Sequence, residues 1–216
     1  MDSYNATSRT KVRRLSKRAS YDKLAVHAIL DEGFVCHIGF ALDAQPYVIP
    51  TIYARAGDTL YVHGSAASRM LRTLTRGVPV CITVTLLDGL VLARSAFHHS
   101  LNYRSVVVIG NARLVDDRDE KMRALHLITD HVVPGRWEEV RSPNDLELKQ
   151  SSVLALPLAE LSAKIRSGPP LDDEEDYALS VWAGVVPVTT RLGAPTSDGR
   201  VPAGVPDFDL ARFPRS

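Results

Sequence analysis

One segment carries the residue types that bind a phosphate at the start of a helix. It runs from Thr59 to Arg72 and joins a predicted strand to a predicted helix. Gly64 and Ser65 let the backbone approach a ligand, and the free N–H groups of a helix start attract an anion. Arg69 would add a charge-assisted contact to that anion. The alternative is an ordinary helix cap, formed by Ser65 or Ser68, beside surface arginines.

A second candidate for anion binding is Tyr103-Arg104-Ser105, where a predicted strand begins. A guanidinium and a hydroxyl that enter a buried strand need polar partners. A phosphate shared with Arg69 would satisfy both groups, and a salt bridge at the edge of the sheet would do so equally well. Both interpretations stay open from the residues alone.

The seven histidines show no spacing typical of a structural metal site, so we expect none. His126 and His131 are five residues apart on a predicted helix, and their side chains diverge. His98 and His99 are adjacent in a predicted loop, where either would serve as an axial haem ligand or as an acid beside a cofactor. Structural or solvent-exposed roles are commoner for a lone histidine. Gly-x-Ser-x-Gly, Walker and His-Glu-x-x-His motifs do not occur, which argues against the commonest hydrolases and nucleotidases.

These residues are positioned by segments that predict an antiparallel β fold. Six stretches rich in β-branched and aromatic residues predict strands: Phe34–Phe40, Tyr47–Ala54, Thr59–His63, Val78–Leu86, Tyr103–Val115 and Ser152–Leu158. Short connectors at 43–46 and 56–58 favour hairpins. Helical periodicity predicts helices over Ser20–Glu32, Ala66–Thr75 and Asp117–Val132. The expected fold is mainly β, a small antiparallel barrel flanked by short helices.

The two ends of the chain differ in composition from residues 20–188, which we expect to form one domain. Residues 1–19 hold six Lys and Arg against one acid, which predicts a solvated basic arm rather than a nucleic-acid site. Residues 189–216 are rich in Pro and Gly and predict an extended or partly disordered tail that would be free to wrap a partner subunit. The acidic run Asp172–Asp176 predicts a charged helix start rather than a metal site.

Composition places the chain among globular proteins. Its 216 residues have a net charge of +1, with 45% hydrophobic and 24% charged residues, which excludes a wholly disordered chain. No stretch approaches the roughly 18 apolar residues of a membrane helix. Cys36 and Cys81 cannot supply a disulfide framework or a four-cysteine zinc cage. Because no apolar signal segment follows the basic residues, we expect a cytoplasmic protein.

The order of these segments resembles the pyridoxamine 5'-phosphate oxidase-like flavin-binding split barrels, in particular the branch that contains nitroimidazole-resistance proteins. The resemblance spans about residues 20–188. The motifs that carry it are Val48–Tyr53, Tyr61–Ser65, Ser68-Arg69, Tyr103–Val106 and Val181–Pro187. It implies a six-stranded antiparallel split barrel, a homodimer, and FMN in a groove at the dimer interface. Relatives in this group use the deazaflavin F420 or handle haem instead, and both stay alternative cofactors.

The resemblance also implies which residues bind the cofactor. Those that would hold the phosphate are Ser68, Arg69, Arg104 and Ser105, with Tyr103 beside them. Those that would line the isoalloxazine ring are Pro50, Thr51 and Tyr53. Those that would frame the same groove are His63, Gly64 and Ser65. Trp182 resembles a residue that approaches the flavin from the other subunit.

One departure from the family bears on activity. Pyridoxamine phosphate oxidases follow this Trp-containing segment with an Arg-Leu-x-Asp-Arg type sequence that binds substrate, whereas Trp182 leads into Ala-Gly-Val-Val-Pro. We therefore expect an FMN-dependent oxidoreductase that reduces a small acceptor such as a nitro compound or a quinone. The flavin would carry the chemistry, so no side chain need act as a nucleophile. The alternative is a non-catalytic flavin or haem carrier whose basic arm recruits nucleic acid or another protein.

Overall fold

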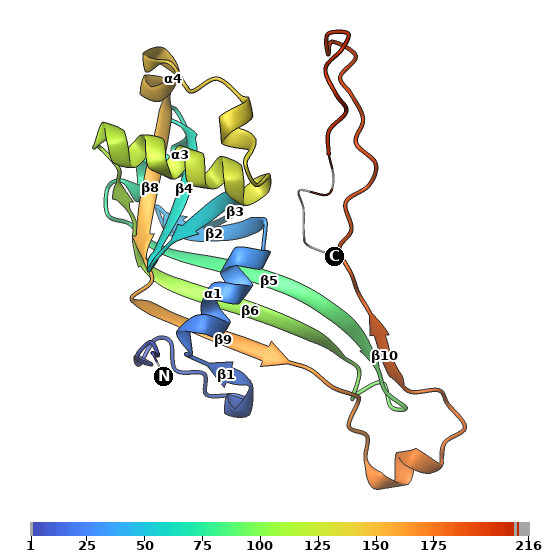
Figure 1. Cartoon of the computed structure of the whole chain (residues 1–216). Coiled ribbons are helices and arrows are strands. Elements are labelled where there is room, and N and C mark those ends of the chain that lie inside the picture. Colours follow the sequence, from blue (N-terminus) through green and yellow to red (C-terminus); the bar gives the residue numbers. More distant parts are fainter. Residues whose placement is uncertain (1, 210, 212–216) are drawn as a thin grey trace.

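The protein is built around one antiparallel sheet, which Figure 1 shows for the computed structural model. The structure describes residues 2–209 and 211. Within them, ten strands pair in the order β1-β9-β6-β5-β2-β3-β4-β8-β7, and β10 pairs with β5. The strands are β1 (Ala19–Ser20), β2 (Val35–Leu42), β3 (Gln45–Ala56), β4 (Thr59–Ser65), β5 (Pro79–Leu92), β6 (Ser100–Asn111), β7 (Arg113–Leu114), β8 (Ser151–Pro157), β9 (Glu160–Arg166) and β10 (Gly184–Pro187). Every pairing is antiparallel, which confirms the mainly β prediction.

The six predicted strands correspond to β2, β3, β4, β5, β6 and β8, and the last predicted residues of the fifth segment form β7. Strand β9 was not predicted. It buries Leu161 and Ala163 completely, but Glu160 and Lys164 interrupt its apolar residues. Its mixed composition hides the alternation that would identify a half-buried strand.

Short helices cover the sheet (Figure 1). They are α1 (Lys23–Glu32), α2 (Arg69–Leu74), α3 (Arg118–Val132), α4 (Asp145–Gln150) and the 3-10 helices η1 (Ser16–Arg18), η2 (Arg136–Glu139) and η3 (Glu174–Ala178). Asp22 caps α1, since its carboxylate accepts from the N–H of Ala25 at 2.8 Å. Asp117 caps α3 in the same way. The three predicted helices are therefore present, and two of them begin about three residues later than predicted.

Tight turns set the register of the β2–β3–β4 region. Asp43 and Ala44 both have positive φ angles, 51° and 63°, as a two-residue hairpin turn requires. The pairing that follows places Phe40 opposite Tyr47 and Cys36 opposite Thr51. The short connectors therefore do join antiparallel neighbours.

Two apolar clusters hold the fold together. The larger one fills the inside of the barrel and includes Val26, Ile38, Leu60, Ile82, Val106 and Leu161. The smaller one lies under α3 and includes Val115, Ala124, Leu125, Leu148, Val153 and Ala155. The stripe that predicted α3 thus packs this helix onto the outside of β3, β4 and β8, as Figure 1 shows.

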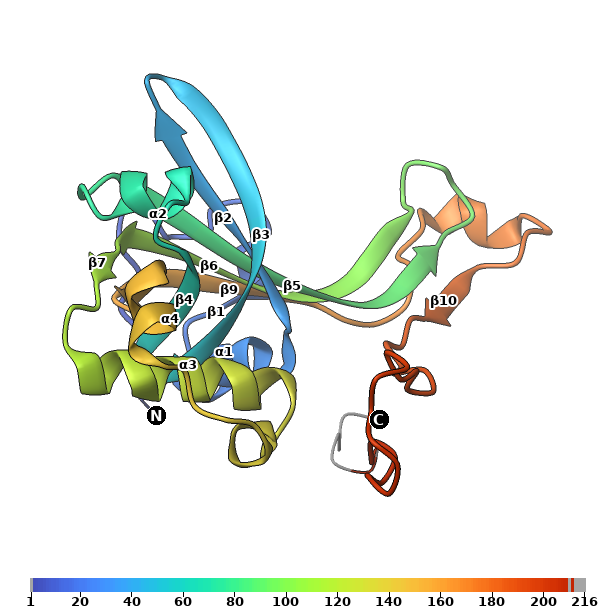
Figure 2. The ribbon, with the colours of Figure 1, turned by 90° about the horizontal axis from the view of Figure 1, so that it is seen from above.

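Strands β5 and β6 continue beyond the barrel as a long curved arm, seen at the right of Figure 2. We use "the arm" for residues 88–101 and 168–187. A register shift between Leu87 and Gly89 marks its start, and β10 pairs with β5 there. The Arg94 guanidinium contacts Asp172 at 3.1 Å and lies over the ring of Tyr177. The acidic run begins η3 as predicted, although Asp172 itself is held by this ion pair.

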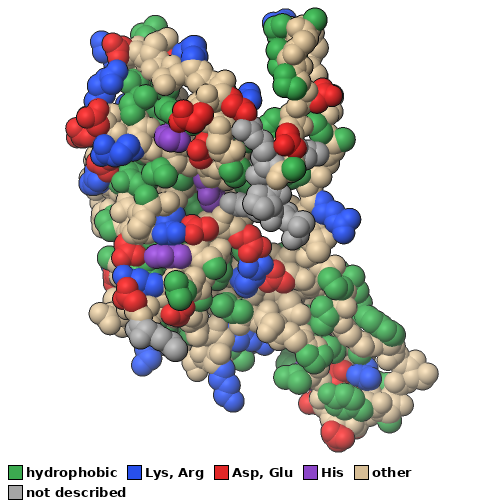
Figure 3. Space-filling view, viewed as in Figure 1, with side chains coloured by type: hydrophobic (Ala, Val, Ile, Leu, Met, Phe, Trp, Pro, Cys, Tyr) green, Lys and Arg blue, Asp and Glu red, His purple; other side chains and the backbone are tan. Residues whose placement is uncertain are grey.

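The arm exposes many apolar side chains, which Figure 3 shows at the lower right of the molecule. They are Leu90, Phe97, Leu101, Leu171, Tyr177, Leu179, Val181, Trp182 and Val186. Phe97 is 88% exposed and Trp182 is 65% exposed. Contiguous apolar surface of this kind marks an interaction site.

The N-terminal segment contacts the barrel at a few positions, while five of its six basic side chains are exposed to solvent. Thr10 is buried, and its carbonyl accepts a hydrogen bond from the hydroxyl of Tyr21. The hydroxyl of Tyr4 donates to Asp58 at 2.5 Å. Arg9 forms an ion pair with Glu160. Charge counting missed this docking because Tyr4 and Thr10 supply local polar and apolar contacts between the basic residues.

The C-terminal segment contains neither helix nor strand between residues 188 and 209, in agreement with the extended tail predicted there. The rest of the predicted tail, residues 210 and 212–216, lies outside the described residues. The proposed boundaries at 19/20 and 188/189 stay predictions. None of the helices in the described part of the chain is long and apolar enough to span a membrane.

Candidate functional site

The predicted phosphate-binding segment forms the junction between β4 and α2. Ser68 caps the helix through the N–H of Leu71, and the hydroxyl of Ser65 accepts from the N–H of Ala67 at 3.2 Å. A Cβ on Gly64 would lie 3.1 Å from a methyl of Leu71, so glycine allows close packing of strand and helix here. The capping interpretation is therefore what the structure shows for Ser68, whereas Ser65 bonds within the turn that precedes α2.

Arg69 is the exposed cation of this junction. Its guanidinium lies over the ring of Tyr47, 4.5 Å from the centroid. Within residues 2–209 and 211, no ion pair joins Arg69 to a carboxylate, whereas Arg55, Arg104 and Arg113 each have one. A guanidinium with no counter-ion, fixed on an aromatic ring, suits an anionic ligand.

Arg104 already has two carboxylate partners. It donates to Asp88 at 2.7 Å and to Glu32 at 2.8 Å. These hydrogen bonds, that to Asp88 first, raise the pKa of Arg104 above its ordinary value. The hydroxyl of Ser105 donates to the carbonyl of Lys164. The salt-bridge interpretation of this segment is therefore the one that the chain adopts.

The two predicted halves of the phosphate site are not adjacent in one chain. Tyr47, under Arg69, pairs with Phe40, which pairs with Val80 on β5. Arg104 pairs with Leu86, six residues further along β5. At about 3.3 Å per residue the two sites lie roughly 20 Å apart along the strands. The expectation that Arg69 and Arg104 share one phosphate is thus wrong within a single chain, because the register separates them. Tyr103, beside Arg104, is half-buried.

The residues expected to line the flavin ring divide between the two faces of β3. Pro50 is exposed and Thr51 is half-buried. Tyr53 is completely buried, and its hydroxyl donates to the carbonyl of Leu30 at 2.6 Å. The expectation that Tyr53 lines the flavin ring is therefore wrong, because its buried side chain has no surface left for a ligand. Side chains alternate along a strand, so neighbouring motif positions cannot all face one groove.

His63 lies on the face of β4 that α3 covers. Tyr61, two residues earlier on the same face, donates to Glu120 of α3 at 2.9 Å. Nδ1 of His63 is buried and has no hydrogen-bond partner in the described chain. Burial lowers the pKa of His63, because the charged ring would lose its hydration. Burial therefore favours the neutral form of this imidazole.

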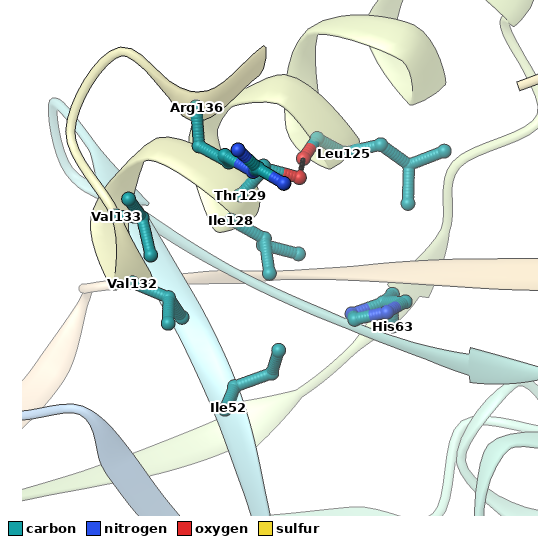
Figure 4. A pocket seen from close by; sticks show the side chains of 8 residues that line it. All are labelled: Ile52, His63, Leu125, Ile128, Thr129, Val132, Val133 and Arg136. Carbon is teal, nitrogen blue, oxygen red and sulfur yellow. Dashed lines mark hydrogen bonds between the residues drawn. The ribbon is translucent and has the colours of Figure 1, made fainter. Parts of the chain in front are cut away.

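A cavity of about 240 Å³ opens beside this imidazole, as Figure 4 shows. Its lining residues are Ile52, His63, Leu125, Ile128, Thr129, Val132, Val133 and Arg136. In Figure 4, Ile128 lies between His63 on one side and Arg136 on the other. The cavity is thus lined mainly by aliphatic side chains, with one imidazole and one guanidinium among them.

Sequence reasoning missed most of this cavity. The α3 stripe was noticed, but all of it was expected to cover the sheet, whereas Ile128 and Val132 line the cavity. Arg136 belongs to η2, which was not predicted. The sequence does hold a signal for the turn that brings η2 to this cavity. It is the apolar pair Val132-Val133 followed by Gly135, since α3 ends at Val132 and Gly135 begins η2.

The other candidate groups lie on the arm, away from α2. Trp182 stands next to Gly184, where a Cβ would be 3.0 Å from the indole. His98 contacts Asp173 at 3.3 Å, and Nδ1 of His99 lies 2.9 Å from the carbonyl of Ser95. Across the described residues, no three His, Cys, Asp or Glu side chains gather closely enough to hold a metal ion.

Comparison with solved structures gives two relatives that match almost the whole chain. The flavocytochrome Anf3 from Azotobacter vinelandii is 42% identical, with a TM-score of 0.89, and the match covers 94% of each chain. The FAD and heme binding protein from Mycobacterium smegmatis is 37% identical, with a TM-score of 0.86, over 90% of this chain and 96% of that one.

A more distant relative is a protein from Bacteroides thetaiotaomicron that is provisionally assigned to 5-nitroimidazole antibiotic resistance. It is 26% identical, with a TM-score of 0.58, over 68% of this chain and 86% of that one. No curated protein sequence matches the chain. A family profile described as Pyridoxamine 5'-phosphate oxidase matches residues 22–165. The chain therefore belongs to the pyridoxamine 5'-phosphate oxidase family, within which its architecture is that of a split barrel.

Proposed function

We propose that this protein is a redox protein that binds both a flavin and a haem. The observation that carries the proposal is the extent of the match to the flavocytochrome: it covers 94% of the chain, whereas the family profile ends at residue 165. The similarity therefore includes the end of the arm and part of the tail. A relative that binds FAD and haem shares this extent.

FAD is the flavin that we propose, since the Mycobacterium smegmatis relative is named for it. FMN was the form expected from the family resemblance, and F420 an alternative to it. Arg69 supports a phosphate-bearing cofactor because its guanidinium has no carboxylate partner in the described chain and is held over Tyr47. A diphosphate would meet this cation with charge-assisted hydrogen bonds.

When bound, a flavin would exchange one or two electrons and a haem one electron with external partners. The chain's part is to bind, orient and shield these groups. Arg69 would hold the phosphate, and the apolar walls formed by Ile52 and Ile128 would exclude water from beside His63. A nitro compound or a quinone is the class of acceptor that we propose to test.

A homodimer is part of the proposal. The arm exposes Phe97 and Trp182 far from the barrel core, and a second copy would cover such a surface. Trp182 would then lie at the partner's flavin, as the family resemblance implies.

The proposal is tested on the purified full chain by its absorbance spectrum and by mass spectrometry of the cofactors that denaturation releases. Released FAD together with a haem Soret band is the expected result, and FMN or F420 would correct the flavin form. A protein that holds neither cofactor and takes up none of FAD, FMN or hemin would overturn the proposal.

Turnover distinguishes an oxidoreductase from a carrier. The flavin is reduced without oxygen by a chemical reductant, and a nitroaromatic or a quinone is then added. Rapid reoxidation with product formation supports an enzyme. Tight cofactor binding without turnover supports the carrier.

A further inference from the structure

Three strands of the arm present one apolar row to solvent. Leu90 of β5 pairs with Leu101 of β6 on one side and with Val186 of β10 on the other. Directly paired residues of antiparallel strands point to the same face of a sheet, so these three side chains form a row. They are 39%, 45% and 41% exposed, respectively. This face of the arm is therefore left open by the part of the chain that the structure describes.

Trp182 extends the same face. Gly184 pairs with Leu92, two residues beyond Leu90 on β5, so a Cβ at Gly184 would point to the side of Leu90. The indole of Trp182 lies against that position, with a ring carbon 3.0 Å from where the Cβ would be. Three strands spaced at about 4.8 Å span roughly 10 Å, which is comparable with the width of a porphyrin. The face is thus broad enough to pack against a flat apolar ring.

His99 adjoins this face at the start of β6. It directly precedes Ser100, the first residue of the strand, and lies two residues before Leu101. The alternation of β6, extended by this one residue, puts His99 on the side of Leu101. The residue is exposed, and Phe97 beside it in the loop is 88% exposed. An imidazole that a ligand can reach therefore stands at the edge of the apolar face.

The ring of His99 is fixed through one nitrogen and open at the other. Nδ1 lies 2.9 Å from the carbonyl oxygen of Ser95, and a carbonyl only accepts, so Nδ1 carries the proton in the neutral ring. The lone pair is then on Nε2, which has no hydrogen bond within residues 2–209 and 211. Histidines that bind a metal are commonly oriented in this way, by a carbonyl behind the other nitrogen.

The remaining histidines lack this combination. Four of them use Nε2 in a hydrogen bond: His27, His98, His126 and His131. The exposed ring of His37 is not fixed by any hydrogen bond within the described part of the chain, and Nδ1 of His63 is buried. Of the two histidines that the sequence raised as haem ligands, the structure therefore favours His99 over His98.

On the basis of the proposed function, we propose that Nε2 of His99 is an axial ligand of the haem, and that the haem ring packs against the arm face that carries Leu90, Leu101 and Trp182. A haem combines an iron that binds imidazole with a flat apolar ring, and this part of the arm offers a group for each. The site is open within one chain, so it needs no internal cavity. The second copy that the arm is proposed to bind would cover the outer side of the ring.

The test compares His99→Ala with His98→Ala in the full chain. The readouts are the Soret band and the ratios of haem and of flavin to protein. We expect His99→Ala to lose haem at least tenfold and to retain flavin, and free imidazole to restore haem binding. His98→Ala removes the neighbouring ring, which contacts the exposed Asp173, and should bind both cofactors as the parent does. Retained flavin shows in each case that the variant is folded.

Two further variants test the ligand and the apolar face separately. His99→Met should bind haem with a shifted Soret band and a raised reduction potential, because a thioether replaces imidazole on the iron. Trp182→Ala should lower the retained haem several-fold without moving the band. Full haem retention in Trp182→Ala would place the ring away from this face.

The outcomes separate this inference from the proposed function. Haem bound in full and with an unaltered spectrum by His99→Ala would overturn the His99 assignment and leave the proposed function intact. A loss of haem in His98→Ala as large as that in His99→Ala would likewise overturn the choice of His99. A parent protein that binds flavin but takes up no hemin would overturn both the haem half of the proposed function and this inference.

Discussion

The phenol of Tyr53 donates a 2.6 Å hydrogen bond to the backbone carbonyl of Leu30, in the last turn of α1. The last carbonyls of a helix have no partner within it, so this bond satisfies a buried acceptor and ties α1 to β3. Tyr53 is therefore a structural residue of the barrel, although its motif resembles a flavin-lining one.

Replacing this phenol tests its role. Tyr53→Phe should lower the free energy of unfolding by about 1 to 3 kcal/mol, because the Leu30 carbonyl stays buried without its donor. Flavin affinity should not change. Urea unfolding and flavin titration measure the two quantities, and Tyr61→Phe is the control for a partly exposed hydroxyl. A loss of flavin affinity without a loss of stability would return Tyr53 to the cofactor site.

Arg69 should contribute to flavin binding through its charge. Arg69→Ala is expected to weaken flavin binding by about 1 to 3 kcal/mol, because a charge-assisted hydrogen bond to the phosphate is lost. Arg76→Ala removes another exposed arginine, just beyond the end of α2, and serves as the control. Fluorescence titration of the apoprotein gives both affinities, and equal affinities would exclude Arg69 from the site.

Arg104 should act mainly on stability. Arg104→Ala leaves Asp88 and Glu32 close together without their shared cation. We expect a loss of about 1 kcal/mol in the free energy of unfolding, reduced by salt because the groups are partly exposed. Arg104→Ala combined with Asp88→Asn should recover part of it. A fall in flavin affinity as large as that of Arg69→Ala would show instead that Arg104 binds the phosphate in the assembled protein.

Asp58 makes the docking of the N-terminal segment depend on pH. The hydrogen bonds from Tyr4 and then Lys23 lower the pKa of Asp58 to about 2, against burial, which raises it. The pKa of Asp58 is lower in the folded protein than in the unfolded chain, where it is about 3.9. The stabilisation that ionised Asp58 provides is therefore fully present above about pH 3.9. It is lost as the pH falls towards 2. Burial and the bond to Asp58 also raise the pKa of Tyr4, so docking should weaken again above about pH 10.

Limited trypsin digestion measures this docking. At pH 7 to 8, Asp58→Asn should speed cleavage at the exposed basic residues 11–17 several-fold, because Tyr4 and Lys23 lose their ionised partner. Asp43→Asn, in an exposed turn, should not. Equal rates of cleavage would mean that other contacts hold the segment.

The arm should mediate self-association. Charged substitutions of its exposed aromatic residues, Phe97→Glu and Trp182→Glu, should shift sedimentation from dimer to monomer, because a charge is costly in an apolar interface. Leu24→Glu, at an 80% exposed position of α1, is the control. An arm variant that still sediments as a dimer would place the interface elsewhere.

The sequence alone was sufficient for features that depend on near neighbours. The alternation of Val80, Ile82 and Val84 identified the buried face of β5, and the two-residue turn at Asp43-Ala44 follows from a short polar connector. The apolar stripe likewise identified α3. Each of these signals depends on residues close together in the sequence, so it can be recognised without knowing the tertiary structure.

Tertiary structure decided every feature that depends on which strands become neighbours. Arg104 meets Glu32 across 72 positions of sequence, and this pair, not a phosphate, satisfies the guanidinium in the chain. The same holds for His63, whose cavity is lined by Ile128 and Arg136 from segments more than sixty residues later. A motif records residue types and spacing, but partners and burial come from sheet register and helix packing, which bring distant segments into contact.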